Sequence, residues 1–298
     1  MRLFRGASMA AALILPLTLT GCSLMFFRTR KLPKPISVGT AQTLTPLELV
    51  KEIDARWEEM QTLNATVEIQ ASAEKSAEGV ARDYTTFRSI ILLRKPGMLR
   101  VFGRVPVVGT TMFDMATDGS NFTLYVPSKS KAVRGANSMK KKSANQFENL
   151  RPDFFYDAMM VRGLEPEDNF SVTADSETLV DDSKKHLYIV PEYVINITRT
   201  VPGTREQTPV RSITMIRTTM LPYQQDFYDD AGNVVTHVVY SGYQDFGFGS
   251  YPGTITIRRP QEQFQLVLTV EKISRNTPLS DDQFSVKVPA DVPVQNLE

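Results

Sequence analysis

Residues 113–126 read FDMATDGSNFTLYV, and this stretch decides the fold. Two short runs rich in apolar residues, 113–117 and 122–126, flank the tripeptide Asp118-Gly119-Ser120. An Asp-Gly pair between two such runs is the short-range signal of a β-hairpin. The stretch therefore predicts two antiparallel strands that are joined by a tight turn.

Similar runs recur on both sides of this hairpin. Before it, residues 66–71 alternate between apolar and polar side chains, and residues 87–93 and 98–102 flank the turn Lys95-Pro96-Gly97. After it, the sequence predicts further strands, two of them separated by the turn 229–233, at Leu187–Val190, Val210–Arg217, Tyr223–Tyr228, Val234–Tyr240, Thr254–Arg258 and Phe264–Lys272. Many strands at regular spacing that are joined by hairpin turns indicate one large antiparallel sheet.

Two segments have helical features instead. Thr45-Pro46-Leu47-Glu48 carries the residues of a capping box with a proline in the first turn. Apolar residues then recur at helical spacing at Val50, Ile53, Trp57 and Met60, which predicts a helix from about 46 to 62. A cluster of apolar residues predicts a second short helix over 152–161.

The number of strands also predicts the shape of the sheet. A sheet this long curls, and its concave face needs a cover. Two helices are too few to fill a wide curled sheet, which leaves either a tightly collapsed barrel or a cavity lined by inward-facing apolar side chains. The predicted fold class is mainly β with two or three helices: a single curled antiparallel sheet, or half-barrel, covered by helices around an apolar cavity. We predict one domain over residues 45–290 and a C-terminal tail at 291–298.

The N-terminus has the pattern of an export signal. Two arginines precede an apolar stretch from Ala10 to Leu19, and Thr20-Gly21 leads to Cys22, the single cysteine. We predict a signal peptide over residues 1–21, because the apolar stretch is shorter than the roughly 20 residues that span a bilayer. The residues before Cys22 resemble the lipobox of bacterial lipoproteins, which implies lipid attachment to the Cys22 sulfur. The alternative is an ordinary signal peptide with an incidental cysteine.

Residues 22–44 are predicted to form a lipidated N-terminus and a flexible tether. Pro33, Pro35 and Gly39 disfavour regular structure, and three basic residues lie close to the predicted lipid. These basic residues either touch anionic headgroups, at ~1 kcal/mol each, or belong to a soluble linker. Ser23 is not the acidic residue that retains enterobacterial lipoproteins at the inner membrane, so we predict sorting to the outer membrane.

The charge balance argues against one class of partner. Removing residues 1–21 takes away two arginines and no acidic residue, which changes the formal charge from +1 to −1. A chain this balanced has no general attraction to nucleic acid. One local exception is a run of basic residues from Lys129 to Lys142. We interpret it as a solvated loop, with a headgroup-binding patch as the alternative.

The sequence has no recognisable catalytic or metal-binding motif. His186 and His237 are far apart and lack metal-ligand spacing, and no nucleophile-elbow, Walker, HExxH or EF-hand pattern occurs. The acidic pairs Asp181-Asp182, Asp229-Asp230 and Asp281-Asp282 lie beside turn residues, where aspartate bonds its own backbone. We therefore predict a binding protein without metal or cofactor, and not an enzyme.

Three phrases of the sequence, in their order, resemble the LolA/LolB superfamily of periplasmic lipoprotein carriers and receptors. The resemblance covers roughly residues 46–273. Residues 99–111, LRVFGRVPVVGTT, are similar to the family's strand, Pro-hydrophobic-Gly loop and following strand. Residues 154–163 resemble the short helix near the mouth of the cavity. Residues 240–255, followed by 264–273, are similar to the closing strands.

LolB-like receptors of the outer membrane are the nearest branch of this superfamily. Their loop carries an exposed apolar side chain that enters lipid, and Val107 or Val108 matches that position here. Two departures from the family pattern are residues 192–209, which look like an insertion, and residues 278–284, which extend beyond the LolB-like core.

The resemblance implies a lipid-anchored protein of the bacterial cell envelope, at the periplasmic face of the outer membrane. Its apolar cavity would accept acyl chains, and it would receive or insert lipoproteins or lipids that arrive from a soluble LolA-like periplasmic carrier. The alternative is a structural or sensory lipoprotein that uses the same fold to bind a partner protein or an envelope glycan.

Overall fold

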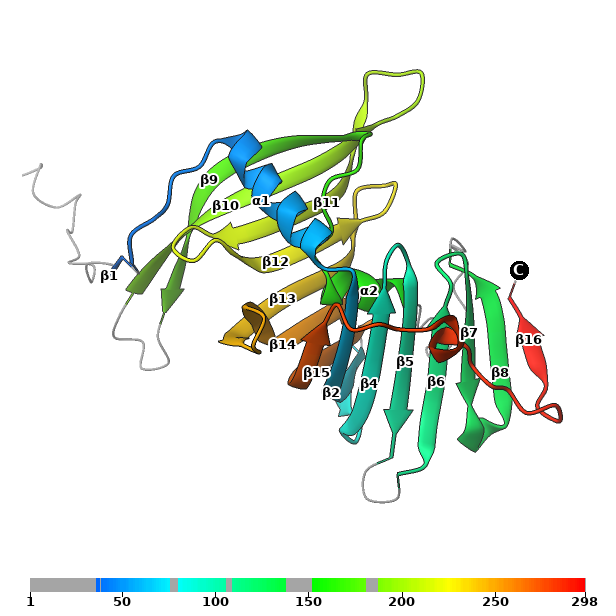
Figure 1. Cartoon of the computed structure of the whole chain (residues 1–298). Coiled ribbons are helices and arrows are strands. Elements are labelled where there is room, and N and C mark those ends of the chain that lie inside the picture. Colours follow the sequence, from blue (N-terminus) through cyan, green and yellow to red (C-terminus); the bar gives the residue numbers. More distant parts are fainter. Residues whose placement is uncertain are drawn as a thin grey trace, which may run out of the picture.

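The computed structural model describes six segments of the chain, namely residues 36–37, 39–75, 80–105, 109–137, 152–180 and 187–297. Several residues named above lie outside these segments, namely the whole predicted signal peptide, Cys22, Ser23, Pro33, Pro35, Val107, Val108, Lys142, Asp181, Asp182 and His186. Figure 1 shows one long curled sheet with two helices packed against it.

The described strands all belong to one sheet. Their order in space is β9 (Asp168–Val180), β10 (Leu187–Thr200), β11 (Gln207–Ile216), β12 (Leu221–Tyr228), β13 (Val234–Asp245), β14 (Ser250–Arg259), β15 (Phe264–Arg275), β2 (Thr62–Lys75), β4 (Phe87–Arg94), β5 (Met98–Arg104), β6 (Thr111–Thr117), β7 (Asn121–Val126), β8 (Lys131–Ala136) and β16 (Val294–Asn296). Two short strands, β1 (Ile36–Ser37) and β3 (Val80–Asp83), pair with β10 and β2. Neighbours are antiparallel except in the β1–β10 and β8–β16 pairs. The prediction of one large curled, mainly antiparallel sheet is confirmed.

The hairpin at residues 113–126 forms as predicted. Asp118 Oδ1 accepts hydrogen bonds from the backbone N–H groups of Ser120 at 2.8 Å and Asn121 at 2.7 Å. Gly119 adopts a φ of +97°, which a side chain would oppose. The turn residues therefore carry the geometry that joins β6 to β7.

A central seam joins two meanders of the chain. β2 pairs with β15 from Leu63 opposite Arg275 to Ala73 opposite Phe264. On one side of this seam lie β4 to β8, and on the other side lie β10 to β14. The inward-facing residues of both meanders line one continuous concave face, because the antiparallel register carries the alternation from strand to strand.

Helix α1 (Pro46–Glu59) begins with the predicted capping box. Thr45 Oγ1 accepts from the Glu48 backbone N–H at 3.3 Å, and the Glu48 carboxylate accepts from the Thr45 backbone N–H at 2.8 Å. Leu49 and Ile53 are buried against the apolar side chains of β10 and β11. The helix ends three residues before the predicted boundary, since Met60 is already extended.

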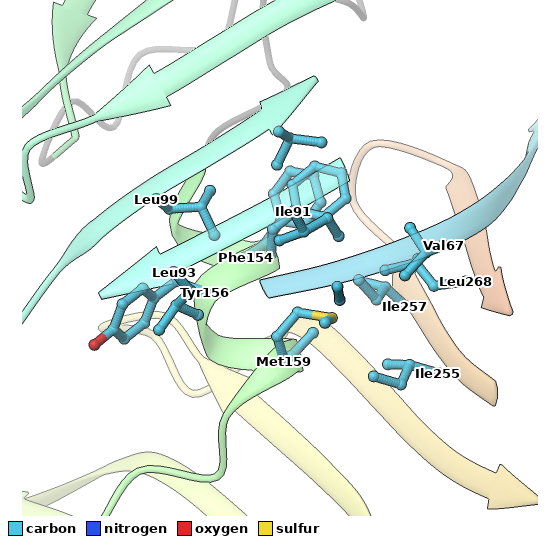
Figure 2. Close-up of a cluster of buried hydrophobic side chains, with 14 of the residues drawn as sticks. Val67, Ile91, Leu93, Leu99, Phe154, Tyr156, Met159, Ile255, Ile257 and Leu268 are labelled. Atoms are coloured by element: carbon cyan, nitrogen blue, oxygen red, sulfur yellow. The ribbon is translucent and has the colours of Figure 1, made fainter. Parts of the chain in front are cut away.

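Helix α2 (Pro152–Met159) confirms the second predicted helix and lies in the main hydrophobic core. Figure 2 shows Phe154, Tyr156 and Met159 of α2 among side chains from strands on both sides of the seam, including Leu99 and Ile255. The helix therefore packs inside the curl, where it joins the two meanders.

One prediction about the strands was wrong. The predicted strand ended at Val190, but β10 continues to Thr200 and pairs with both β9 and β11. Part of 192–209, which looks like an insertion relative to the family, thus belongs to the sheet. Pro191 is tolerated because it lies one residue before the first β10–β11 pair, and its carbonyl accepts from the Arg217 N–H at 2.9 Å. β9, on the far side of β10, was not predicted.

The basic run and the C-terminal boundary also need correction. Lys131 and Arg134 lie in strand β8 and not in a solvated loop. Residues 294–296, placed in the predicted tail, form β16 and pair with β8. Neither strand has a clear sequence signal, because β8 is basic and β16 has only three residues.

The described part of the predicted tether makes hydrogen bonds to the sheet. Ile36 pairs with Tyr188 of β10, Gln42 donates its backbone N–H to the Arg217 carbonyl at 3.0 Å, and Leu44 donates its own to Tyr193 Oη at 3.0 Å. Residues 36–37 and 39–44 therefore follow the sheet before α1 begins.

A C-terminal strap, defined here as residues 276–297, crosses the convex face of β4 to β8 (Figure 1). Arg94 Nη1 donates to the Leu279 carbonyl at 2.6 Å, and Arg100 Nη1 donates to the Gln283 carbonyl at 3.0 Å. Phe284 is buried, with the Arg94 guanidinium 5.1 Å from its ring centroid. The strap includes the 3₁₀ turn η4 (Asp281–Phe284).

Candidate apolar binding pocket

An apolar pocket of about 380 Å³ lies on the concave face, between α2 and the strands on either side of the seam. Its lining is dominated by apolar side chains and comprises Ile69, Ala71, Ser72, Ala73, Tyr84, Thr85, Phe87, Met112, Phe113, Met115, Leu124, Val126, Ser128, Lys129, Phe155, Phe264 and Leu266. The volume lies within the range of small-molecule sites.

The pocket leads from the hydrophobic core to solvent. Its inner wall contains Ile69, Met115 and Leu124, which are buried. Its mouth contains Tyr84 and Lys129, which are exposed. The polar lining residues are concentrated at this exposed end. The pocket therefore has an apolar interior and a solvent-exposed polar entrance, which suits an amphipathic molecule.

The pairing of strands β5 and β6 positions the aromatic side chains of the pocket wall. Phe87 and Phe113 meet edge to face, with ring centroids 5.7 Å apart. Phe113 lies opposite Gly103 in the β5–β6 ladder, and a Cβ at Gly103 would stand 2.6 Å from the Phe113 ring. The ring occupies its place because Gly103 has no side chain.

Three side chains of the sheet hold the C-terminal end of α2. The last carbonyls of a helix lack intrahelical partners. Here Gln225 Nε2 donates to the Asp157 carbonyl at 3.3 Å, Tyr240 Oη donates to the Ala158 carbonyl at 3.0 Å, and Tyr251 Oη donates to the Met159 carbonyl at 2.7 Å. These donors come from three consecutive strands, β12, β13 and β14.

This anchoring also fixes the pocket, because Phe155 of α2 forms part of its wall. Sequence reasoning did not identify the three donors. The available signal was the pair of tyrosines in the closing strands, at 240 and 251, which alternation directs to the concave face.

A buried charged group lies beside the end of α2. Arg162 Nε is 3.1 Å from Asp157 Oδ1, and Arg211 Nη2 donates to the Gly163 carbonyl at 3.0 Å. Burial raises the pKa of the Asp157 carboxyl, and nearby arginines oppose this shift. Burial lowers the pKa of the Arg211 guanidinium to about 10. The group ties the segment after α2 to strand β11 and lies outside the pocket lining.

The sequence-predicted polar candidates do not gather in the pocket. His237 Nδ1 lies 2.6 Å from Asp226 Oδ1 on neighbouring strands, outside the pocket lining. Asp229 Oδ1 accepts from the backbone N–H groups of Ala231 at 3.0 Å and Asn233 at 2.9 Å, so it stabilises its own turn as predicted. In the described segments, no group of three or more His, Cys, Asp or Glu residues has the geometry to hold a metal ion.

The connection between β5 and β6 leads directly into a strand that lines the pocket. Val105 donates its backbone N–H to the Thr110 carbonyl at 2.8 Å, and Gly109 donates to the Val105 carbonyl at 3.0 Å. Met112 and Phe113 directly follow this turn and line the pocket. The described ends of the predicted membrane-inserting loop are thus next to the pocket.

Among the helices that the structure describes, none is both long and apolar enough to cross a membrane.

The curled sheet with its inner helix defines a LolA-like fold. A LolA superfamily protein from Nitrosomonas europaea matches with a TM-score of 0.50 and 14% identity, over 82% of this chain and 99% of that one. A DUF1329 family protein from Desulfovibrio piger matches with a TM-score of 0.52 and 15% identity, over 80% of this chain and 95% of that one. These similarities agree with the superfamily resemblance and do not favour LolB-like receptors within it.

A comparison of the sequence with protein-family models identifies the family of this chain. Residues 99–288 match the model of a family that is described as "Uncharacterized protein", and this chain belongs to that family. No curated protein matches the sequence.

Proposed function

We propose that this protein is a lipid-anchored lipoprotein of the bacterial cell envelope that binds acyl chains without catalysing a reaction. The observation that carries the proposal is the apolar pocket, with its buried inner wall and exposed polar mouth. By analogy with the superfamily, it would receive or insert lipoproteins or lipids at the periplasmic face of the outer membrane, as LolB-like receptors do. A soluble LolA-like carrier would be its partner.

The energetics of acyl transfer support such a role. Each methylene that leaves water is stabilised by ~0.8 kcal/mol, so a free acyl chain crosses an aqueous space only against a high barrier. A pocket that shelters part of the chain lowers this barrier. Release into a bilayer follows if the bilayer buries more of the chain than the pocket does.

Dye displacement tests the binding function directly. The mature domain should enhance the fluorescence of an apolar dye and lose that signal when fatty acid or lipopeptide is added. Ala71→Leu, which adds a larger side chain to the pocket wall, should weaken dye binding. Ala174→Leu, on the exposed surface of β9, is the matched control and should leave it unchanged. A dye that stays dark with the wild-type protein contradicts the proposal.

Anchoring rests on the lipobox before Cys22. The Cys22→Ala variant should take up no labelled palmitate and should be found as a soluble or uncleaved protein. The wild-type protein should sediment with the outer membrane on a density gradient, because Ser23 is not acidic. Undiminished palmitate labelling of the variant would refute the anchor.

We assign delivery into a membrane to the loop that carries Val107 and Val108, since strand β6, which follows it, lines the pocket with Met112 and Phe113. Two glutamates there would oppose entry into lipid, where each valine would contribute ~1 kcal/mol or more. The double variant Val107→Glu, Val108→Glu should bind dye and melt like the wild type but transfer cargo to liposomes more slowly. Normal delivery would remove the loop from the mechanism.

The alternative is a structural or sensory lipoprotein that binds a partner protein or a glycan. Strand β9 favours it, because thirteen residues form an edge that, within the described chain, pairs only with β10. Native mass spectrometry of the delipidated mature domain separates the two functions. Co-purified lipid supports the acyl-binding role, and an empty domain supports the alternative.

A further inference from the structure

Strand β9 forms one end of the sheet and has a long edge (Figure 1). Its 13 residues pair with β10 in an unbroken register, from Asp168 opposite Arg199 to Val180 opposite Leu187. Among the described strands, only β10 pairs with it. Along such an edge, alternate residues direct their backbone N–H and C=O groups away from the sheet, where another extended chain can pair with them.

This edge lacks three features that prevent strand pairing. Residues 168–180 contain neither proline nor lysine, and no β-bulge interrupts the β9–β10 register. The charged residues of β9 are all acidic, namely Asp168, Asp175 and Glu177, which gives the strand a formal charge of −3. A second copy of β9 would bring an equal negative charge to the edge. The acidic residues therefore disfavour pairing with a second copy and favour a basic partner.

Three carboxylates form an acidic triplet on one face of this edge, namely Asp175, Glu177 and Glu192 of β10. Asp175 lies directly opposite Glu192 in the ladder, and Glu177 lies two residues further along the same face. Burial raises the pKa of the Glu192 carboxyl, and the charges of Glu177 and Asp175 add to this shift. Asp175 also accepts from the Ser176 backbone N–H at 2.7 Å. Like charges at such short range repel, so cations placed beside the triplet would stabilise it.

The opposite face of β9 is apolar over part of its length. Phe170, Val172 and Ala174 alternate along it, and Val172 packs against the buried side chains of α1, β10 and β11. Phe170 is 39% exposed, and Ala174 is exposed as well. A strand that paired with β9 would therefore place its side chains alternately beside carboxylates and beside apolar groups.

We infer that the edge of β9 binds an extended segment of a partner protein that carries lysine or arginine on one face and apolar residues on the other. Backbone pairing would supply affinity, and the two faces would supply selectivity. No β9 residue lines the apolar pocket. The surface is thus separate from the proposed acyl-binding site, and the inference does not depend on that function.

Two labelled octapeptides with blocked ends test the charge complementarity, KTKVTVTL and its acidic counterpart ETEVTVTL. In antiparallel pairing, the lysines of the first would lie opposite Glu177 and Asp175, and its apolar residues opposite Ala174, Val172 and Phe170. Fluorescence polarisation on the mature protein should show that the lysine peptide binds about tenfold more tightly than the acidic one. This preference should decrease as salt is added.

The variants assign the preference to β9. Asp175→Asn with Glu177→Gln should reduce it to about twofold or less, and the double variant should melt at or above the wild-type temperature, because repulsion with Glu192 is removed. Glu52→Gln with Glu206→Gln is the matched control. It removes the same charge from exposed positions outside β9 and should retain the preference.

Two further measurements distinguish strand pairing from simple attraction between charges. Methylation of alternate backbone nitrogens of the lysine peptide should abolish binding in one of the two phases and be tolerated in the other, because only alternate amides face β9. Hydrogen exchange should show that alternate amides of residues 168–180 exchange rapidly in the free protein and become protected by the peptide.

Several results would overturn the inference. They are equal binding of the two peptides, binding of neither, equal effects of both methylation phases, or a β9 edge that is already protected in the free protein. A dimer of the mature protein that the lysine peptide dissociates would identify a second copy as the occupant, which also contradicts the inference. Dye binding is measured on the same samples, so a failure at β9 is distinguished from a failure of the acyl-binding function.

Discussion

Replacing Tyr240 by phenylalanine should destabilise the protein through one buried hydroxyl. That hydroxyl donates to the Ala158 carbonyl at 3.0 Å and accepts a hydrogen bond from the Gln225 amide. The Tyr240 side chain is 3% exposed and Gln225 is fully buried, so water cannot replace either partner without rearrangement. The variant leaves one helix-terminal carbonyl without a donor and one buried amide with fewer partners.

The expected magnitude follows from these two losses. A buried polar group that loses its partner costs about 1–3 kcal/mol. Gln225 Nε2 keeps its 3.3 Å contact with the Asp157 carbonyl, so its loss is partial. We therefore expect Tyr240→Phe to lower the free energy of unfolding by about 2–4 kcal/mol. Tyr251→Phe, which removes the donor to the Met159 carbonyl, should cost about 1–3 kcal/mol.

Urea unfolding followed by circular dichroism measures both effects. Tyr228→Phe is the control, because its hydroxyl is half-buried and lies 3.4 Å from Ser212 Oγ, and it should change stability by less than about 0.5 kcal/mol. The m-value should stay constant in all three variants. If Tyr240→Phe unfolds at the wild-type midpoint, the sheet does not hold α2 through its terminal carbonyls, and the reasoning is refuted.

Three further predictions follow from close packing and burial. Gly253→Ala should cost about 1–3 kcal/mol in a urea melt, since its Cβ would stand 2.6 Å from a backbone carbonyl of β13; an unchanged midpoint contradicts that geometry. Phe284→Ala should cost about 3 kcal/mol and speed proteolysis of the C-terminal strap while dye binding persists. Burial raises the pKa values of Tyr240 and Tyr251 above the ordinary value of 10, so the stability they contribute is complete below pH 10 and is lost as pH rises further. The lowered pKa of Arg211 has the opposite effect on the pH dependence of stability, but it is one group against two tyrosines. The urea concentration at the unfolding midpoint should therefore decrease as the pH rises from about 9 to about 11.5.

The sequence alone predicted the elements that are stabilised by residues close to each other along the chain. The capping box at Thr45 and the turn at Asp118 are satisfied by neighbours within a few residues, so the sequence alone specifies them. The alternation in 66–71 likewise predicted the face that β2 buries, since Val67 and Ile69 are both in the core. These predictions did not depend on knowing which strands would meet.

Elements at the edges of the sheet carried no comparable signal. β9 pairs on one side only and leaves most of its side chains exposed, so its sequence shows no apolar alternation. β10 has such an alternation in Tyr193, Ile195 and Ile197, but Pro191 separates it from the predicted strand 187–190. A proline disrupts a strand only where its backbone nitrogen would have to donate a hydrogen bond to a neighbouring strand. The sequence alone does not show whether a given residue must donate such a bond.

The pocket needed tertiary information for a different reason. Inward-facing apolar residues were predicted, but a cavity remains only where their side chains fail to fill the space. That depends on Gly103 beneath the Phe113 ring and on the position of Phe155, which sheet residues far away in sequence fix through α2. No local sequence pattern predicts a cavity that depends on residues so far apart along the chain.

The seam between β2 and β15 gives the molecule a late assembly step. The two strands meet across about 200 residues of chain, so the closure of this long loop must be offset before their contacts contribute to stability. During synthesis each meander can form its own hairpins, yet the concave face stays divided until residues 264–275 emerge. Phe264 and Leu266, which belong to β15, complete the pocket wall at that moment. The complete pocket therefore arises only when strands from both ends of the fold have paired, and a nascent chain lacks this pocket until that moment.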